Sequence, residues 1–123
     1  MTVVMMISAL AFAAQSAPAA TQPAPETGAE AAYEQLAAGA NQDAIARIQT
    51  ALAQTPGDPA LLINLGTAYS REGRFEEARA AFRNAIAAED RYRVQLADGS
   101  WEDSRRVARL ALDSLDRTAF AAR

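Results

Sequence analysis

Cysteine and histidine are both absent from this chain of 123 residues, and its 12 basic residues are all arginine. The absence of cysteine excludes disulfide bonds, thiol nucleophiles and zinc sites that use sulfur ligands. The absence of histidine removes the side chain that most often acts as a general acid or base. A net charge of −3 argues against a nucleic-acid partner, because such proteins usually carry a basic face. We attribute the lack of lysine to a GC-rich genome rather than to phosphate recognition.

Large apolar residues are also scarce. Half of the chain counts as hydrophobic, but alanine inflates that share, and aromatic residues contribute only 7%. Alanine favours helices yet buries little surface, so the core has to rest on a few leucine, isoleucine and aromatic side chains. The length is sufficient for one small domain.

The first 14 residues form an uncharged, mostly apolar run that includes the cleavage-like tripeptide Ala11-Phe12-Ala13. This pattern predicts a secretory signal peptide over residues 1–14, although no basic residue precedes the apolar run. An uncleaved membrane anchor and an untargeted terminus are the alternatives, and the run is short for a membrane span. Residues 15–27 are rich in alanine and proline and are predicted to be a disordered linker. We therefore expect an exported protein with one folded domain over residues 28–123.

The most informative stretch covers residues 58–89 and contains two helical patterns separated by Gly73. Asp58 can cap a helix and is followed by a proline suited to the first helical position, so a helix is predicted over residues 59–71. Gly73 permits the positive φ that often ends a helix, and a second helix is predicted over residues 74–88. Large and very small side chains recur at regular positions of this helical hairpin, namely Leu62, Leu65, Gly66, Tyr69, Ala78, Phe82 and Ala85.

These positions resemble the signature of a tetratricopeptide repeat, a helix–turn–helix unit of about 34 residues. One position departs from it, because Asp90 stands where the family has proline. The resemblance implies an all-α solenoid of stacked helical pairs. It also implies that Gly66 and Ala78 let the two helices approach closely, while Tyr69 and Phe82 fill the space between units. All seven signature residues are therefore expected to be packing residues.

A degenerate copy of the same unit precedes this repeat. At an offset of about 34 residues, small residues and a proline recur in register, namely Gly39, Ala44, Ala51 and Pro56, and Ile48 stands at the position of Phe82. The sequence thus predicts repeats over about 25–58 and 59–92. Asn41 is expected to cap the second helix of the first repeat.

In tetratricopeptide repeats, the first helix of each unit lines a concave groove that binds partner proteins. The resemblance implies this function for one face of the helix over residues 59–71 and for one residue of the preceding repeat, namely Tyr33, Ile63, Asn64, Thr67, Ser70 and Arg71. Asn64 matches the family's groove asparagine, which bonds a ligand's backbone or terminal carboxylate, and Arg71 could supply charge. Alternatively, Asn64 is simply the common residue at this position and contacts no ligand.

The pattern changes near residue 90. Tyr92, Val94 and Leu96 alternate with polar residues, which predicts an extended segment over residues 91–97. We favour an extended loop there. The alternative is a lone strand that recruits a strand from a partner or from a second copy of the chain.

A final helix is predicted to cap the stack over about residues 101–121, after the turn signal Asp98-Gly99. Its apolar stripe consists of Val107, Leu110, Ala111, Ser114 and Leu115. Trp101 is expected to pack beneath this helix as core, and the alternative is an exposed anchor for a partner. This tail also loosely resembles the ends of small exported tetratricopeptide proteins of Gram-negative bacteria, which implies a periplasmic location.

The resemblance implies a non-enzymatic adaptor of the bacterial cell envelope that binds a peptide or helix of another protein. The alternative is a structural subunit whose repeat face joins copies of the chain or an obligate partner. We expect no cofactor, no metal, no nucleic acid, and no membrane contact beyond the N-terminal segment. Neighbouring carboxylates such as Glu76-Glu77 and Glu102-Asp103 point to different helix faces, so they do not converge as a catalytic pair.

Overall fold

The computed structural model of the protein describes residues 35–96 and 98–121. A short helical turn at residues 35–37 precedes the elements α2 (Asn41–Gln54), α3 (Pro59–Arg71), α4 (Phe75–Ala87), β1 (Arg93–Gln95), β2 (Trp101–Asp103) and α5 (Ser104–Ala121). The predictions for residues 1–14, for residues 15–27, for the opening helix of the first repeat and for Tyr33 lie outside the described residues.

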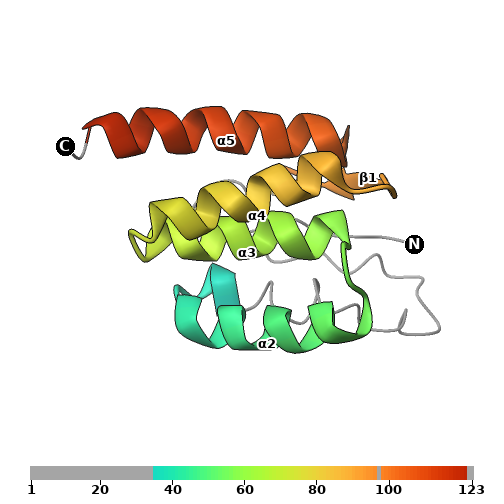
Figure 1. Ribbon diagram of the computed structural model, residues 1–123, viewed down its shortest axis with the longest axis horizontal. Helices are drawn as coiled ribbons and strands as arrows, with labels where there is room; N and C mark the ends of the chain where they lie inside the picture. Colours follow the sequence, from blue (N-terminus) through green and yellow to red (C-terminus); the bar gives the residue numbers. More distant parts are fainter. Residues whose placement is uncertain (1–34, 97, 122–123) are drawn as a thin grey trace.

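The helices α2 to α5 lie in chain order, and each runs antiparallel to the one before it (Figure 1). α3 packs between α2 and α4, while α5 packs on α4 and also reaches α3. The predicted all-α class and its helix–turn–helix stacking are confirmed, with a short two-stranded sheet before the last helix. Within the described ranges, no helix is long and apolar enough to cross a lipid bilayer.

Asp58 sets the start of α3 as its N-cap residue. The Oδ1 atom of Asp58 accepts hydrogen bonds from the backbone N–H groups of Ala60 at 2.9 Å and Leu61 at 3.2 Å. Pro59 follows as the first helical residue, where its missing N–H leaves no hydrogen bond unmade. The start of α3 therefore lies where the sequence chemistry predicts it.

Replacement of Asp58 by alanine is expected to lower the free energy of unfolding by about 0.5–2 kcal/mol, because two N–H groups lose their acceptor. Asp58→Asn keeps a side-chain oxygen and should lose less. Urea unfolding followed by circular dichroism measures both variants. Equal losses for the two variants would contradict the capping explanation.

Two of the turns between helices use glycine at a positive φ, which is 77° at Gly39 and 73° at Gly73. Residues with a side chain adopt this conformation only with a steric penalty, so glycine ends these helical segments. The prediction that Asn41 caps α2 is wrong. The carbonyl of Ala40 already accepts the first helical hydrogen bond, from the N–H of Ala44 at 3.0 Å. Ala40 is therefore the N-cap residue, and Asn41 lies inside the helix.

The core is built around α3, whose residues from Pro59 to Tyr69 are all buried. Gly66 lies so close to α4 that a Cβ atom placed on it would be 2.5 Å from Cε1 of Phe82. Real Cβ atoms essentially never approach another atom so closely, so glycine at this position brings α3 and α4 together. The structure buries all seven residues that repeat spacing marks for packing: Leu62, Leu65, Gly66, Tyr69, Ala78, Phe82 and Ala85.

The segment after α4 forms a β-hairpin. β1 pairs antiparallel with β2, so that Val94 lies opposite Glu102 and Gln95 opposite Trp101. Val94 is fully buried, whereas Arg93 on the same strand is exposed, which agrees with the alternating pattern of the sequence. The extended segment is thus a strand rather than the favoured loop, and its pairing partner comes from the same chain.

Two expectations for the segment around Trp101 are wrong. The last helix begins at Ser104 rather than near residue 101, because Trp101–Asp103 continues as β2. Asp103 then acts as the cap, and its Oδ1 atom accepts a hydrogen bond from the N–H of Arg105 at 2.9 Å. Trp101 lies outside the core, with 37% of its surface exposed. Trp101 belongs to β2, so its side chain is not part of the buried face of α5.

Candidate functional site

The second halves of α3 and α5 border a small, partly open cavity next to α4. Both helices run in the same direction, so these two halves meet at one end of the stack (Figure 1). The volume of the cavity is about 110 Å³. Its lining combines apolar side chains, hydroxyl groups and one guanidinium, and comprises Thr67, Ser70, Arg71, Phe82, Ala111, Ser114, Leu115 and Thr118.

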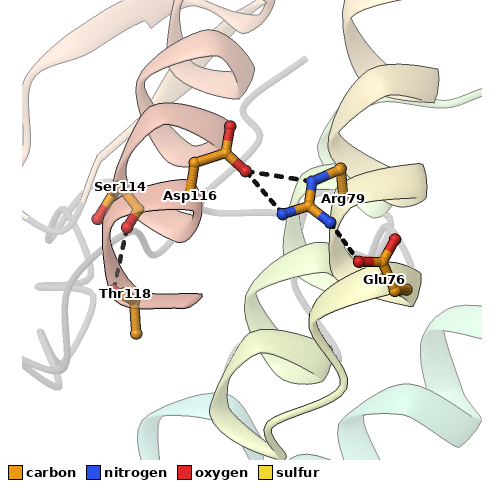
Figure 2. A network of polar contacts seen from close by, with 5 residues as sticks. All are labelled: Glu76, Arg79, Ser114, Asp116 and Thr118. Atoms are coloured by element: carbon orange, nitrogen blue, oxygen red, sulfur yellow. Dashed lines mark hydrogen bonds and ion pairs between the residues drawn. The ribbon is translucent and has the colours of Figure 1, made fainter. Parts of the chain in front are cut away.

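Hydroxyl groups supply much of the polar lining. The Thr67 hydroxyl donates to the carbonyl oxygen of Ile63 at 3.0 Å, and the Thr118 hydroxyl donates to that of Ser114 at 3.0 Å. Figure 2 shows the second of these bonds. Such a bond uses the hydroxyl proton, so the oxygen of Thr118 can still accept a hydrogen bond. The hydroxyls of Ser70 and Ser114 make no hydrogen bond to the described residues, so they can donate to a bound group.

Arg71 places a positive charge on the wall of the cavity. It lies in the last turn of α3, and its Nη1 atom donates to the carbonyl oxygen of Leu36 at 2.7 Å. This bond fixes the guanidinium and joins α3 to the described end of the first repeat. Partial burial lowers the pKa of Arg71 from its ordinary value, although an arginine remains protonated at neutral pH.

Arg79 joins α4 to α5 through polar contacts (Figure 2). Its Nε and Nη2 atoms donate to Oδ1 of Asp116 at 3.1 and 2.9 Å, and Nη1 donates to Oε1 of Glu76 at 2.6 Å. The hydrogen bonds to Asp116 and then to Glu76 raise the pKa of Arg79. The ion pair with Asp116 holds α5, the helix that carries Ser114 and Thr118, against α4.

The structure divides the residues that the resemblance assigns to a binding groove. Thr67, Ser70 and Arg71 line the cavity together. Ile63 and Asn64 are fully buried, with no exposed surface, so a partner cannot touch them in this conformation. Their function in binding stays a prediction.

Sequence reasoning missed the contribution of α5. The sequence pattern puts Ser114 on the apolar stripe of the last helix and does not single out Thr118. The order of the helices could have predicted it. A helix antiparallel to α4 runs parallel to α3, so the second halves of α3 and α5 lie at the same end of the stack. Leu110 was placed on the same stripe, and the structure contradicts this, since 52% of its surface is exposed.

The lining residues are apolar or carry a hydroxyl group, apart from the one guanidinium. None of them is a carboxylate, so the cavity has no general acid or base of that type. Its volume is well below the roughly 300–1,000 Å³ of most small-molecule sites. Among the residues that the structure describes, no group of three or more Asp or Glu side chains could hold a metal ion. The cavity can accept one side chain or one terminal carboxylate of a larger ligand.

Comparison with known proteins assigns the chain to a family. No curated protein and no solved structure matches it. A family model described as a tetratricopeptide repeat matches residues 35–97, which is more than half of the chain. The matched region contains the helical pair α3–α4 and the helix α2 that precedes it. Repeats of this family generally mediate protein–protein interactions and are typically not catalytic. On this match, the chain belongs to the tetratricopeptide repeat family.

Proposed function

We propose that the protein is a non-enzymatic adaptor that binds a segment of another protein at the cavity between α3, α4 and α5. The observation that supports this is the lining, in which an apolar floor, hydroxyl groups and a guanidinium share one opening. A partner side chain can fill the floor at Phe82 and Leu115. Carboxylate or backbone oxygens of the partner can then accept hydrogen bonds from Ser70 and Ser114, in the field of the Arg71 charge.

The size of the cavity limits the affinity. A volume of about 110 Å³ accommodates one side chain, and burial of a single aliphatic side chain contributes only about 1.5–3 kcal/mol. Association also costs translational and side-chain freedom. We therefore propose that a partner binds weakly and reversibly, unless it also contacts a second part of the chain.

A matched pair of threonine variants tests the cavity. Thr118 and Thr50 are both exposed helical threonines whose hydroxyls donate to the carbonyl four residues earlier, at 3.0 and 3.1 Å. Only Thr118 lines the cavity, because Thr50 lies on α2. Thr118→Trp is expected to block the opening and to reduce capture of a partner about tenfold or more, a loss of about 1.4 kcal/mol. Thr50→Trp should leave capture unchanged.

The measurement is quantitative capture of envelope proteins by the full chain carrying an affinity tag. Circular dichroism first checks that both variants keep the helical content of the wild type. Substitution of Asn64 is a poor test, because the residue is fully buried and its loss would disturb the core. Equal capture by the Thr118 and Thr50 variants would exclude the cavity as the binding site.

We further propose that the adaptor acts in the periplasm of a Gram-negative bacterium. The support is the uncharged apolar run over residues 1–14, followed by a stretch rich in alanine and proline. Mass spectrometry of the chain recovered from a periplasmic fraction should show a new N-terminus close after Ala13. Retention of the intact chain in the cytoplasm would contradict export.

A further inference from the structure

The outer face of α5 carries two exposed apolar residues with an acid and a base between them. Leu110 and Phe120 have 52% and 76% of their surface exposed, and Asp113 and Arg117 are exposed as well. The four residues are spaced by three, four and three positions. This is the a/d spacing of a coiled coil, which places all four on one face of the helix. We call them the α5 stripe.

The α5 stripe faces away from the rest of the protein. The buried residues of α5 lie on the other face, and they are Ser104, Val107, Ala108, Ala111 and Leu115. α5 also lies at one end of the described stack, opposite α2 (Figure 1). The stripe is therefore accessible to a second molecule, as far as the described residues show.

Two charges of α5 outside the stripe are already paired. Asp116 is paired with Arg79 at 2.9 Å, and Arg106 with Glu102 at 3.7 Å. Asp113 and Arg117 form no ion pair with any residue that the structure describes. Two opposite charges of one stripe are thus free to pair outside their own chain.

The order of residues in the stripe is self-complementary. Consider an antiparallel copy of α5 on the outer face, related by a two-fold axis that crosses the helix at the level of residue 115. This arrangement places Leu110 against Phe120 of the second copy. The same axis places Asp113 against Arg117 of the second copy, and each contact occurs twice. A parallel copy would instead place Asp113 against Asp113 and Arg117 against Arg117. Like charges in contact are unfavourable, so the antiparallel arrangement is selected.

We propose that a second copy of this chain docks antiparallel on the α5 stripe. Two apolar contacts and two ion pairs then form around one symmetry axis. The interface uses the outer face of α5, whereas the adaptor cavity uses the inner side of the same helix. Two bound partners could therefore be held by one dimer.

The proposed dimer is weak. A single pair of helices buries less than the roughly 1,200–2,000 Å² of a standard protein interface. The dimer should therefore dissociate on dilution, and its fraction should depend on protein concentration. Sedimentation velocity of the full chain over a wide range of concentrations is expected to show a monomer–dimer equilibrium.

Charge reversal tests which residues face each other. Asp113→Arg alone places arginine against arginine at both ion pairs, and Arg117→Asp alone places acid against acid. Each single variant is expected to weaken self-association about tenfold or more. The double variant Asp113→Arg/Arg117→Asp restores opposite charges and should dimerise like the wild type. An equimolar mixture of the two single variants should form mixed dimers for the same reason.

Cysteine cross-linking tests the direction of the helices, because the natural chain has no cysteine. In the antiparallel arrangement, Leu110→Cys/Phe120→Cys brings the introduced thiols of the two copies together. Leu110→Cys alone leaves its thiols about 15 Å apart along the axis, too far for a disulfide. We expect oxidation to cross-link the double variant and not the single variant.

Three outcomes would overturn the proposal. One is a full chain that stays monomeric at every concentration, which would leave the stripe to a different protein. Another is a double charge variant that dimerises no better than the single variants. The third is efficient cross-linking of Leu110→Cys alone, which would indicate parallel helices. Matching sedimentation of wild type and double variant, with weaker association of both single variants, would support it.

Discussion

Replacement of Phe82 by alanine is expected to lower the free energy of unfolding by about 3–5 kcal/mol. The ring is 2% exposed and lies between α3 and α4, where its atoms contact Gly66. Small domains are stable by only about 5–15 kcal/mol, so this single change removes a large part of the total. Urea unfolding of the full chain, followed by the circular dichroism signal of its helices, measures the loss.

Gly66 provides a test of the contact itself. Gly66→Ala in the natural chain should be destabilising by about 1–3 kcal/mol, because the new Cβ would lie 2.5 Å from the Phe82 ring. The same change in the Phe82→Ala background meets no ring. There it should be stabilising by up to about 1 kcal/mol, since alanine is the better helix former. The two substitutions thus interact, and the sign of the Gly66 effect reverses.

The outcome that would contradict this account is a Gly66→Ala effect of the same sign and size in both backgrounds. That result would mean that the ring moves aside at little cost, and that the close approach of α3 and α4 does not depend on glycine.

The packing of the central pair could be predicted from sequence because its determinants are local. Helices of this length begin and end at residues with recognisable chemistry, such as Asp58 and Gly73. The spacing of a known repeat marks Gly66 as a point of close approach and Phe82 as a packing residue, and the structure adds that the Phe82 ring lies at Gly66. Once α3 and α4 are helices joined by a short turn, few arrangements bury both apolar faces. Repeat spacing therefore carries tertiary information for this pair.

The last third of the chain was harder to predict because its determinants are not local. Trp101 has strong apolar character, but it lies opposite Gln95 in the hairpin instead of joining the last helix. Leu110 satisfies the helical period of the predicted apolar stripe and is nevertheless exposed, because it lies off the face of α5 that packs against α4, α3 and β2. The spacing of apolar residues indicates which face of a helix is apolar. It does not indicate how much of that face the neighbouring helices cover.

The cavity depends on an even less local relation. Its lining comes from α3, α4 and α5, and no sequence spacing relates Ser70 to Ser114. They come together because α3 and α5 run in the same direction. This follows from the chain order, since α4 is antiparallel to α3 and α5 is antiparallel to α4. The same limit applies to Asn64, because the family position suggests a groove residue while the packing around α3 buries it.

Leu115→Ala is expected to lower the free energy of unfolding by about 2–5 kcal/mol, because it removes a side chain that is 2% exposed between α5 and the repeat. Leu110→Ala is the matched control on the same helix. Leu110 is 52% exposed, so its replacement should change the free energy of unfolding by no more than about 0.5 kcal/mol. Urea unfolding at a concentration low enough to keep the chain monomeric compares the two variants.

The pair separates the two faces of α5 by their consequences. Loss of Leu115 should destabilise the monomer, and it should also enlarge the cavity floor that Leu115 helps to form. Loss of Leu110 should leave the monomer intact and weaken self-association, because its expected contact is Phe120 of the second copy. Equal destabilisation by both variants would mean that Leu110 packs within its own chain, and Phe120 would then lack its expected contact on the second copy.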